Sequence, residues 1–200
     1  MASPDLMSTF ALGPMRVRRS GYGAMQLAGP FAFGTPPDRA SAIGVFQAAV
    51  ADQLAAMVAA RDQGLIAGVG LSNVSLEQLR HAAAGTNIVC VQNLFHLADR
   101  RSAPVLQECL SRGIAFVPFC PLGWPRGADN PVLTSPVLIR TAARLGITPA
   151  QVALQWLLQL APNVLLIPGT GSVAHLRENL AAEGVTLDGQ ALRELDGMAG

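Results

Sequence analysis

Short apolar runs alternate along this chain with longer segments in which apolar residues recur every three or four positions. Five runs have the length and composition of strands: Gly21–Leu27, Ala67–Leu71, Ile88–Gln92, Ile114–Phe119 and Val164–Ile167. The last four are apolar on both faces, as is typical of parallel strands covered by helices. The alternation of strands with helices predicts an α/β fold with a parallel sheet. Ahead of the strands, Thr9–Arg19 predicts a hairpin with Gly13-Pro14 at its turn.

Several helix ends can be recognised between the strands. Ser75-Leu76-Glu77-Gln78 has the pattern of a capping box, in which Ser75 caps the helix and Gln78 reaches back to it. The other predicted helices run from Pro104 to a stop at Gly113, from Thr148-Pro149 onward, and from Gly171-Ser172 through Leu180.

One helical pattern is unusually long. It continues from Asp38 to Gln63, with its apolar stripe at Ile43, Phe46, Val50, Leu54, Met57 and Val58. A helix of roughly 26 residues spans about 39 Å, whereas a whole βα unit of a barrel takes only about 31 residues. Either this is one long helix, or two helices from different units are joined head to tail.

Length and charge narrow the function classes. The 200 residues fit one domain, and 14 Lys+Arg against 13 Asp+Glu give a net charge of +1, which argues against a nucleic-acid partner. The longest stretch without charges, Leu145–Leu176, is interrupted by three prolines and is not expected to span a membrane. The N-terminus shows no signal-peptide pattern. Cys90, Cys109 and Cys120 lie in apolar contexts, which favours thiols in a reducing compartment and hence a cytoplasmic location.

The inventory of reactive side chains excludes some chemistries. All basic residues are arginines, there is no lysine, and Tyr22 is the single tyrosine, so mechanisms that need a Schiff-base or phosphate-loop lysine are excluded. Arg16, Arg18 and Arg19 form a short basic cluster that we interpret as a solvated strand edge. No group of Cys, His, Asp or Glu has the spacing of metal ligands, so we expect no metal site.

A glycine-containing turn follows the last predicted strand. Gly169 and Gly171 come directly before a helix, where backbone N–H groups and the helix dipole favour a phosphate. Phosphate sites in (β/α)8 barrels recur beside the last two strands. Gly169-x-Gly171-x-x-Ala174 also fits a loose dinucleotide fingerprint, but no later strand completes that βαβ unit.

Five segments together resemble one enzyme family. They are Gly21-Tyr22-Gly23-Ala24-Met25-Gln26-Leu27, Gly68-Val69-Gly70-Leu71-Ser72-Asn73, Val91-Gln92-Asn93, Val117-Pro118-Phe119-Cys120-Pro121-Leu122-Gly123, and Ile167-Pro168-Gly169-Thr170-Gly171-Ser172 leading to Glu178-Asn179-Leu180. In this order they resemble the aldo/keto reductases, (β/α)8 barrels that use NADPH to reduce aldehydes and ketones.

The resemblance implies an incomplete barrel. The five strands correspond to the family's first, fifth, sixth, seventh and eighth, so three βα units, or roughly 90 residues, are missing. The join falls near Ala51-Asp52, inside the overlong helix. We therefore expect an incomplete (β/α)8 TIM-barrel type of about five βα units, forming a single domain over residues 1–200 with an internal deletion near residues 51–52.

By resemblance, sixteen residues would contact NADP(H), or NAD(H) in its place. Ser72, Asn73 and Gln92 would bind the nicotinamide amide, and Phe119 would stack on its ring. The amide and hydroxyl side chains offer both donors and acceptors for that role. An ordinary strand-end turn or core aromatic remains the alternative for each. The other residues are Gly23, Ala24 and Met25 on the first strand; Pro121, Leu122, Gly123, Gly169, Thr170 and Ser172 around the phosphates; and His175, Glu178 and Asn179 around the adenosine.

The family's catalytic residues have no counterpart in this sequence. They are a Tyr, an Asp, a Lys and a His on strands two to four or their loops, whereas Tyr22 lies on the first strand and Asp52 on the helix. We therefore expect NADPH-dependent reduction of a small-molecule carbonyl to be impaired or absent. The alternative is a non-catalytic remnant that binds nucleotide or self-associates through unpaired strand edges.

Overall fold

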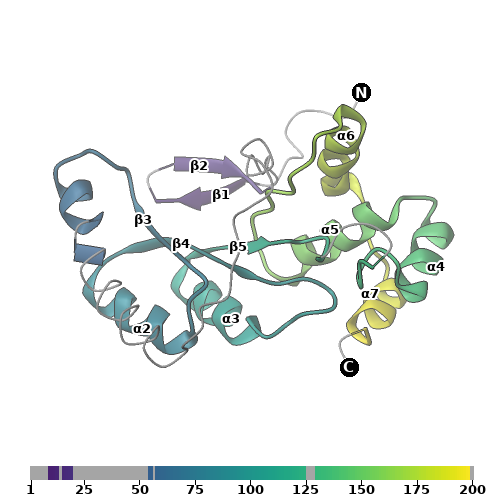
Figure 1. The fold of residues 1–200 in the computed structure, drawn as a ribbon, viewed down its shortest axis with the longest axis horizontal. Coiled ribbons are helices and arrows are strands. Elements are labelled where there is room, and N and C mark those ends of the chain that lie inside the picture. Colours follow the sequence, from purple (N-terminus) through teal and green to yellow (C-terminus); the bar gives the residue numbers. More distant parts are fainter. Residues whose placement is uncertain (1–8, 14, 20–53, 56, 125–128, 199–200) are drawn as a thin grey trace.

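The computed structural model describes residues 9–13, 15–19, 54–55, 57–124 and 129–198 (Figure 1). A parallel three-stranded sheet, in the order β3-β4-β5, forms its centre. The strands are β3 (Val69–Ser72), β4 (Ile88–Leu94) and β5 (Ala115–Phe119), and the helices α2 (Leu76–Gly85) and α3 (Ala103–Arg112) connect them and cover one face. This arrangement confirms the α/β class with parallel strands.

The last predicted strand is shorter than its apolar run suggested. Val164–Ile167 contributes one isolated parallel bridge, between Phe116 and Val164, and not a full strand. Phe116 N–H donates to Asn163 O at 2.8 Å, and Leu165 N–H donates to Phe116 O at 2.9 Å. Leu166 N–H points to the other side of this segment, where it donates to Arg19 O at 2.6 Å. The ladder with β5 does not continue because the next donor due from β5 is Pro118, which has no N–H.

Four further helices and a short 3₁₀ turn form the second half of the molecule (Figure 1). They are α4 (Pro136–Leu145), α5 (Pro149–Leu160), α6 (Val173–Ala181), the 3₁₀ helix Ala182–Gly184 and α7 (Gly189–Asp196). The sequence predicted α5 and α6 but did not single out α4 or α7.

Most predicted helix ends are confirmed by their hydrogen bonds. Ser75 Oγ accepts from Gln78 N–H at 3.2 Å, and the Gln78 side chain accepts from Ser75 N–H at 2.8 Å. Gly113 ends α3 with φ +67°, a conformation that glycine adopts at little cost. The predicted cap at Thr148 is a second capping box, with Gln151 as its partner.

Part of the long predicted helix lies within the described residues. Residues 54–55 and 57–62 are helical, and the turn beyond them closes through Leu65 N–H to Ala60 O at 2.9 Å, with Gly64 at φ +74°. The helix thus ends one residue before the predicted Gln63. Its beginning, the join near Ala51-Asp52 and the predicted first strand Gly21–Leu27 lie outside the described residues.

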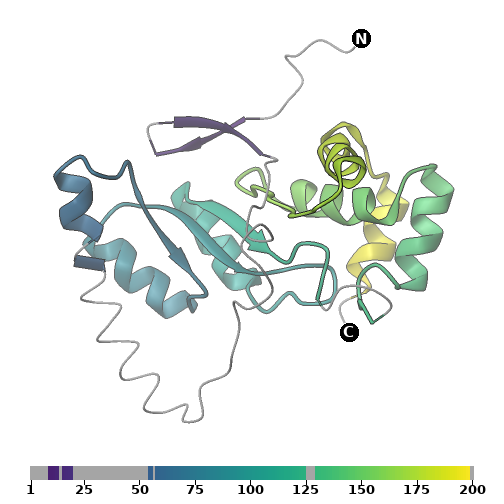
Figure 2. The same cartoon turned by 45° about the horizontal axis from the view of Figure 1, so that its top comes forward.

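The predicted N-terminal hairpin is confirmed. Strands β1 (Thr9–Leu12) and β2 (Met15–Arg18) pair antiparallel around Gly13. Figure 2 shows the hairpin on the side of the sheet away from α2 and α3. There Phe10 and Leu12 pack against a small apolar cluster on the sheet, made by Ala115, Val117, Leu165 and the adjoining Cys90 and Ile167.

The interpretation of the basic cluster as a solvated edge is wrong for Arg19. Its Nε donates to Val164 O at 3.0 Å, and its Nη2 donates to Leu158 O at 2.6 Å and to Ala161 O at 2.7 Å. Leu158 and Ala161 form the C-terminal end of α5, where helix carbonyls lack partners. Arg19 therefore ties the hairpin to α5, and this burial lowers the pKa of its guanidinium.

An aromatic stack joins the sheet to the C-terminal helices. The rings of Phe95 and Trp156 are stacked with centroids 6.2 Å apart, and Phe95 meets Phe116 edge-on at 5.8 Å. The Arg100 guanidinium lies 4.5 Å from the Trp156 ring and donates to Leu195 O at the end of α7. Trp156 Nε1 donates to the Asp196 carboxylate at 2.9 Å.

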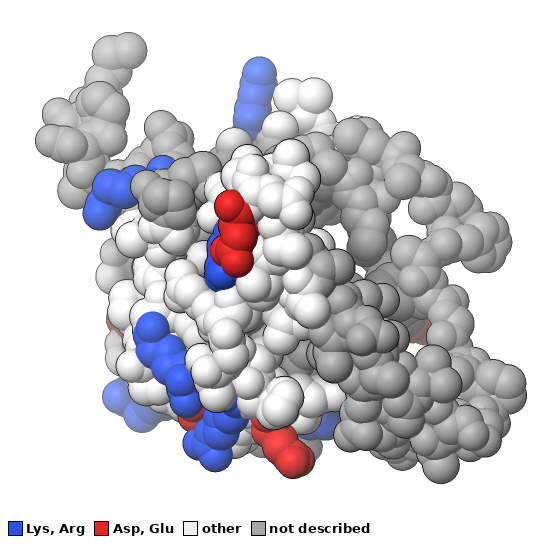
Figure 3. Space-filling model, turned by 90° about the vertical axis from the view of Figure 1, so that its left-hand side faces the viewer, with Lys and Arg blue, Asp and Glu red and all other residues white. Residues whose placement is uncertain are grey.

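The surface at the β3 end of the sheet is mostly uncharged. Figure 3 shows a broad uncharged area on this face, with one positive–negative pair near its middle, single positive side chains toward its top, and a group of both signs along its lower edge. Among the described helices, none is long and apolar enough to cross a lipid bilayer.

Candidate functional site

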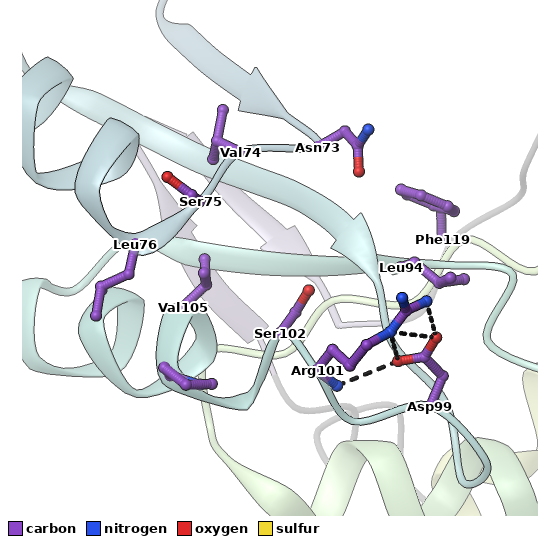
Figure 4. Close-up of a pocket in the computed structure, with 11 residues that line it drawn as sticks. Asn73, Val74, Ser75, Leu76, Leu94, Asp99, Arg101, Ser102, Val105 and Phe119 are labelled. Atoms are coloured by element: carbon purple, nitrogen blue, oxygen red, sulfur yellow. Dashed lines mark hydrogen bonds and ion pairs between the residues drawn. The ribbon is translucent and has the colours of Figure 1, made fainter. Parts of the chain in front are cut away.

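The carboxyl ends of β3, β4 and β5 meet at one edge of the sheet, because the three strands are parallel. In barrel enzymes this edge carries the functional loops. A cleft of about 390 Å³ opens there (Figure 4). Its walls are Asn73–Leu76 after β3, Leu94 on β4, Phe119 at the end of β5, and residues of the loop and first turn that lead into α3.

The four predicted nicotinamide residues lie together at this edge. Ser72 is the register partner of Gln92, Leu94 is the partner of Phe119, and Asn73 N–H donates to Gln92 O at 2.8 Å. Asn73 and Phe119 line the cleft, while Ser72 and Gln92 lie beside it on the strands. Within the described part of the chain, the side chains of Ser72, Asn73 and Gln92 make no hydrogen bond to protein, so their donors and acceptors are available to a ligand.

An ion pair lies on the wall of the cleft opposite Asn73. Arg101 Nε donates to both carboxylate oxygens of Asp99, at 3.0 and 3.1 Å, and Arg101 N–H donates to one of them at 3.1 Å. These bonds lower the pKa of Asp99. The adjacent His96 is buried, which lowers its pKa, and its Nδ1 accepts from Ala98 N–H at 3.2 Å. Asp99 and Arg101 are thus the charged residues that line the cleft, whereas His96 holds the backbone of the loop through its bond with Ala98.

In the loop after β5, Gly123, one of the residues predicted around the phosphates, lies where only glycine fits. Gly123 has φ +84°, and a Cβ there would lie 2.7 Å from Val132 Cγ2. The buried Asn130 side chain fixes the preceding backbone by donating to Leu122 O at 3.0 Å. Pro121, buried, precedes this turn. The predicted residues Pro121, Leu122 and Gly123 therefore form one tight turn directly after β5.

The predicted phosphate turn lies at the start of α6. Ser172 caps the helix and accepts from His175 N–H at 3.4 Å, while Ser172 N–H donates to Thr170 Oγ1 at 3.1 Å. Gly169 and Thr170 follow the segment that bridges to β5, so this turn leaves the sheet at the same edge as the cleft.

The predicted adenosine residues on α6 differ in accessibility. His175 is exposed, Glu178 is half-buried and Asn179 is buried. Gly23, Ala24 and Met25 lie outside the described residues, so their predicted contacts stay predictions. Across the part of the chain that the structure covers, no three His, Cys, Asp or Glu side chains gather as metal ligands.

Sequence reasoning assigned no role to Asn93, although the structure places it behind the cleft. It is buried on β4 and hydrogen-bonded to the backbone of Val74 and to Ser102 Oγ. Its signal in the sequence was an amide side chain inside an apolar strand, where a polar group needs a specific partner.

A parallel sheet covered by helices, with open loops and polar side chains at its carboxyl edge, defines an α/β protein of the barrel class. The model of the aldo/keto reductase family matches residues 31–199. The chain belongs to this family, and its partial sheet fits an incomplete (β/α)8 barrel.

Individual relatives agree with this assignment. The chain is 34% identical to pyridoxine 4-dehydrogenase of Escherichia coli over 286 residues, covering 96% of this chain and 98% of that protein. It is 38% identical to an uncharacterized oxidoreductase of Schizosaccharomyces pombe, covering 72% of this chain and 46% of that one. Among solved structures, a thermostable aldo-keto reductase, Tm1743, in complex with the inhibitor epalrestat matches with a TM-score of 0.66 and 34% identity. That match covers 73% of this chain and 53% of Tm1743, so the chain spans about half of the latter two proteins.

Proposed function

We propose that this chain binds NADP(H), or NAD(H), at the carboxyl edge of its sheet and reduces carbonyl compounds very slowly or not at all. The observation that carries the binding proposal is the set of unengaged polar side chains, Ser72, Asn73 and Gln92, at the same strand ends as the Phe119 ring. A carboxamide needs both donors and acceptors, and a planar ring stacks on an aromatic side chain.

The phosphate end of the nucleotide has its own support. The turn Gly169–Ser172 leads into the N-terminus of α6, where backbone N–H groups and the helix dipole favour an anion. The exposed His175 lies in the first turn of that helix, where the resemblance puts the adenosine, so NADP(H) and NAD(H) are both ligands to test. When bound, the nicotinamide would supply hydride; the residues described here would hold and orient it.

Impaired catalysis follows from what the sequence lacks. It contains no lysine, and Tyr22 is its only tyrosine, so the group that would give a proton to the carbonyl oxygen has no counterpart on strands two to four. A positioned general acid typically contributes about 10²–10⁴-fold to the rate. We therefore expect a reductase rate at least about 10²-fold below that of an intact family member.

The length of the E. coli alignment supports an internal deletion. The alignment has 286 positions, and 96% of this 200-residue chain is 192 residues, which leaves about 94 positions without a residue here. Three barrel units account for roughly 90 residues. We propose that these units are missing near residues 51–52, within one domain.

Two measurements on the purified chain test this function. Titration into NADPH should change the nucleotide's fluorescence in a saturable way, whereas NADPH oxidation should stay near background with several aldehydes. Because the E. coli relative is a pyridoxine 4-dehydrogenase, the 4-aldehyde of pyridoxine belongs among them. Unchanged fluorescence at high protein concentration would contradict the binding, and oxidation at an ordinary reductase rate would contradict the loss of catalysis.

We also propose that two copies of the chain associate through the outer edge of β3. In the described sheet β3 pairs only with β4, and Gly70 and Ser72 on it are exposed. An open, uncharged strand edge is a template for pairing with another chain, and two identical edges can pair antiparallel about a two-fold axis. Sedimentation velocity should show a dimer that dissociates on dilution, and a monomer at every concentration would contradict the proposal.

We further propose a cytoplasmic location, which the thiols of Cys90 and Cys109 support.

A further inference from the structure

Asn93 makes an unusual set of contacts for a residue inside an apolar strand. Its side chain is only 4% exposed, and it points away from the face that carries Gln92. A buried amide costs free energy unless its donor and acceptor are both satisfied. Here both are satisfied by a different segment of the chain.

The two ends of the Asn93 amide bind the backbone of a single residue. Val74 N–H donates to Asn93 Oδ1 at 3.0 Å, and Asn93 Nδ2 donates to Val74 O at 2.7 Å and to Ser102 Oγ at 3.3 Å. The first two bonds have the donor and acceptor pattern of two paired strand residues, with the side-chain amide of Asn93 in place of a backbone. They extend the pairing of β3 with β4 beyond the end of β3. The third bond connects the loop after β3 to the start of α3.

The bonds of Asn93 to Val74 and Ser102, which we call the Asn93 clamp, fix the backbone on the C-terminal side of Asn73. On the other side, Asn73 N–H donates to Gln92 O at 2.8 Å. Between these anchors Asn73 has φ +56°, a left-handed conformation that asparagine tolerates but that competes with extended backbone. Val74, Ser102, Asn73 and Phe119 all line the cleft, and Figure 4 shows the Asn73 amide on the side of the Phe119 ring.

We infer that Asn93 is a positioning residue for the nicotinamide end of the cofactor, acting through Asn73. The inference rests on the proposed nucleotide site. Without the clamp, the loop after β3 gains conformations in which the Asn73 amide no longer faces Phe119. The adenosine half of the nucleotide, at α6, has no bond to Asn93 and keeps its affinity.

The test compares two ligands on the full chain. NADPH contains the nicotinamide, whereas adenosine 2′,5′-bisphosphate contains only the adenosine end. Asn93→Ala should weaken NADPH binding by about tenfold or more, the equivalent of one lost hydrogen bond, and change bisphosphate binding by less than about twofold. Asn93→Asp, which keeps the acceptor for Val74 N–H but loses the donor, offers a second variant of nearly the same size and should show the same split.

Asn163→Ala is the matched control. Asn163 is equally buried and donates to Ile114 O at 2.9 Å, at the opposite end of β5 from the cleft. It should lower stability without changing the ratio of the two affinities. Equal weakening of both ligands by Asn93→Ala, or no weakening of either, would overturn the inference. Failure of the unmodified chain to bind either ligand would instead overturn the proposed function.

Discussion

Replacing Arg19 with methionine should lower the free energy of unfolding by about 4 kcal/mol. Three main-chain carbonyls, on Leu158, Ala161 and Val164, would lose a charged donor in a half-buried position. Hydrogen bonds to charged groups contribute about 1.5 kcal/mol or more each. The helix end would also lose a favourable cation. Urea unfolding followed by circular dichroism measures the change.

Arg16 provides a matched control on the same hairpin. Its guanidinium is exposed and donates to Thr9 Oγ1, so Arg16→Met should change the free energy of unfolding by less than about 1 kcal/mol. Arg19→Lys should fall between the two, because a compact ammonium lacks the planar fork that bridges several carbonyls. Equal effects of Arg19→Met and Arg16→Met would show that the hydrogen bonds of Arg19 to the end of α5 contribute nothing to the free energy of unfolding.

Local signals made much of the fold predictable. A capping box such as Ser75 with Gln78 depends on four consecutive residues, and the sequence contains all of its chemistry. The same holds for the glycine stop at Gly113 and for the hairpin around Gly13. The parallel class followed from strands that are apolar on both faces.

Contacts between distant segments were not predictable in this way. Arg19 bonds to residues more than 130 positions away, and nothing in its neighbourhood distinguishes it from Arg16. The Val164–Ile167 run has the composition of a strand, but its ladder stops at Pro118 of β5, which has no N–H, and the run itself does not reveal that neighbour. For the same reason Asn93 could be recognised as polar in an apolar strand, but not as the partner of Val74.

The absence of lysine has a structural counterpart in the arginines. Arg19 closes the end of α5, and Arg100 closes the end of α7 by donating to Leu195 O and Asp196 O. Each contact uses the several donors of one planar guanidinium, which an ammonium does not match. The same composition that removes the catalytic lysine of the family thus supplies the contacts that hold the C-terminal helices.

The second large loss of stability is expected when Trp156, which is 1% exposed, is replaced. Trp156→Ala should lower the free energy of unfolding by about 4 kcal/mol, the usual range for an aromatic residue cut to alanine in a core. It removes the ring that contacts both Phe95 and Arg100 and leaves the half-buried Arg100 guanidinium without its aromatic partner. Trp156→Phe keeps a ring but loses the Nε1 donor to Asp196 and some volume, so about 1–2 kcal/mol is expected.

The other tryptophan makes this experiment internally controlled. Trp124 is 59% exposed, and Trp124→Ala should change the free energy of unfolding by less than about 0.5 kcal/mol. Because the chain has only two tryptophans, fluorescence of the Trp124→Ala variant reports on Trp156 alone. Its emission should be that of a buried indole and should shift to the red in the same urea transition that circular dichroism detects. A Trp156 signal that changes before the helices unfold would show that the aromatic stack does not hold the C-terminal helices to the sheet.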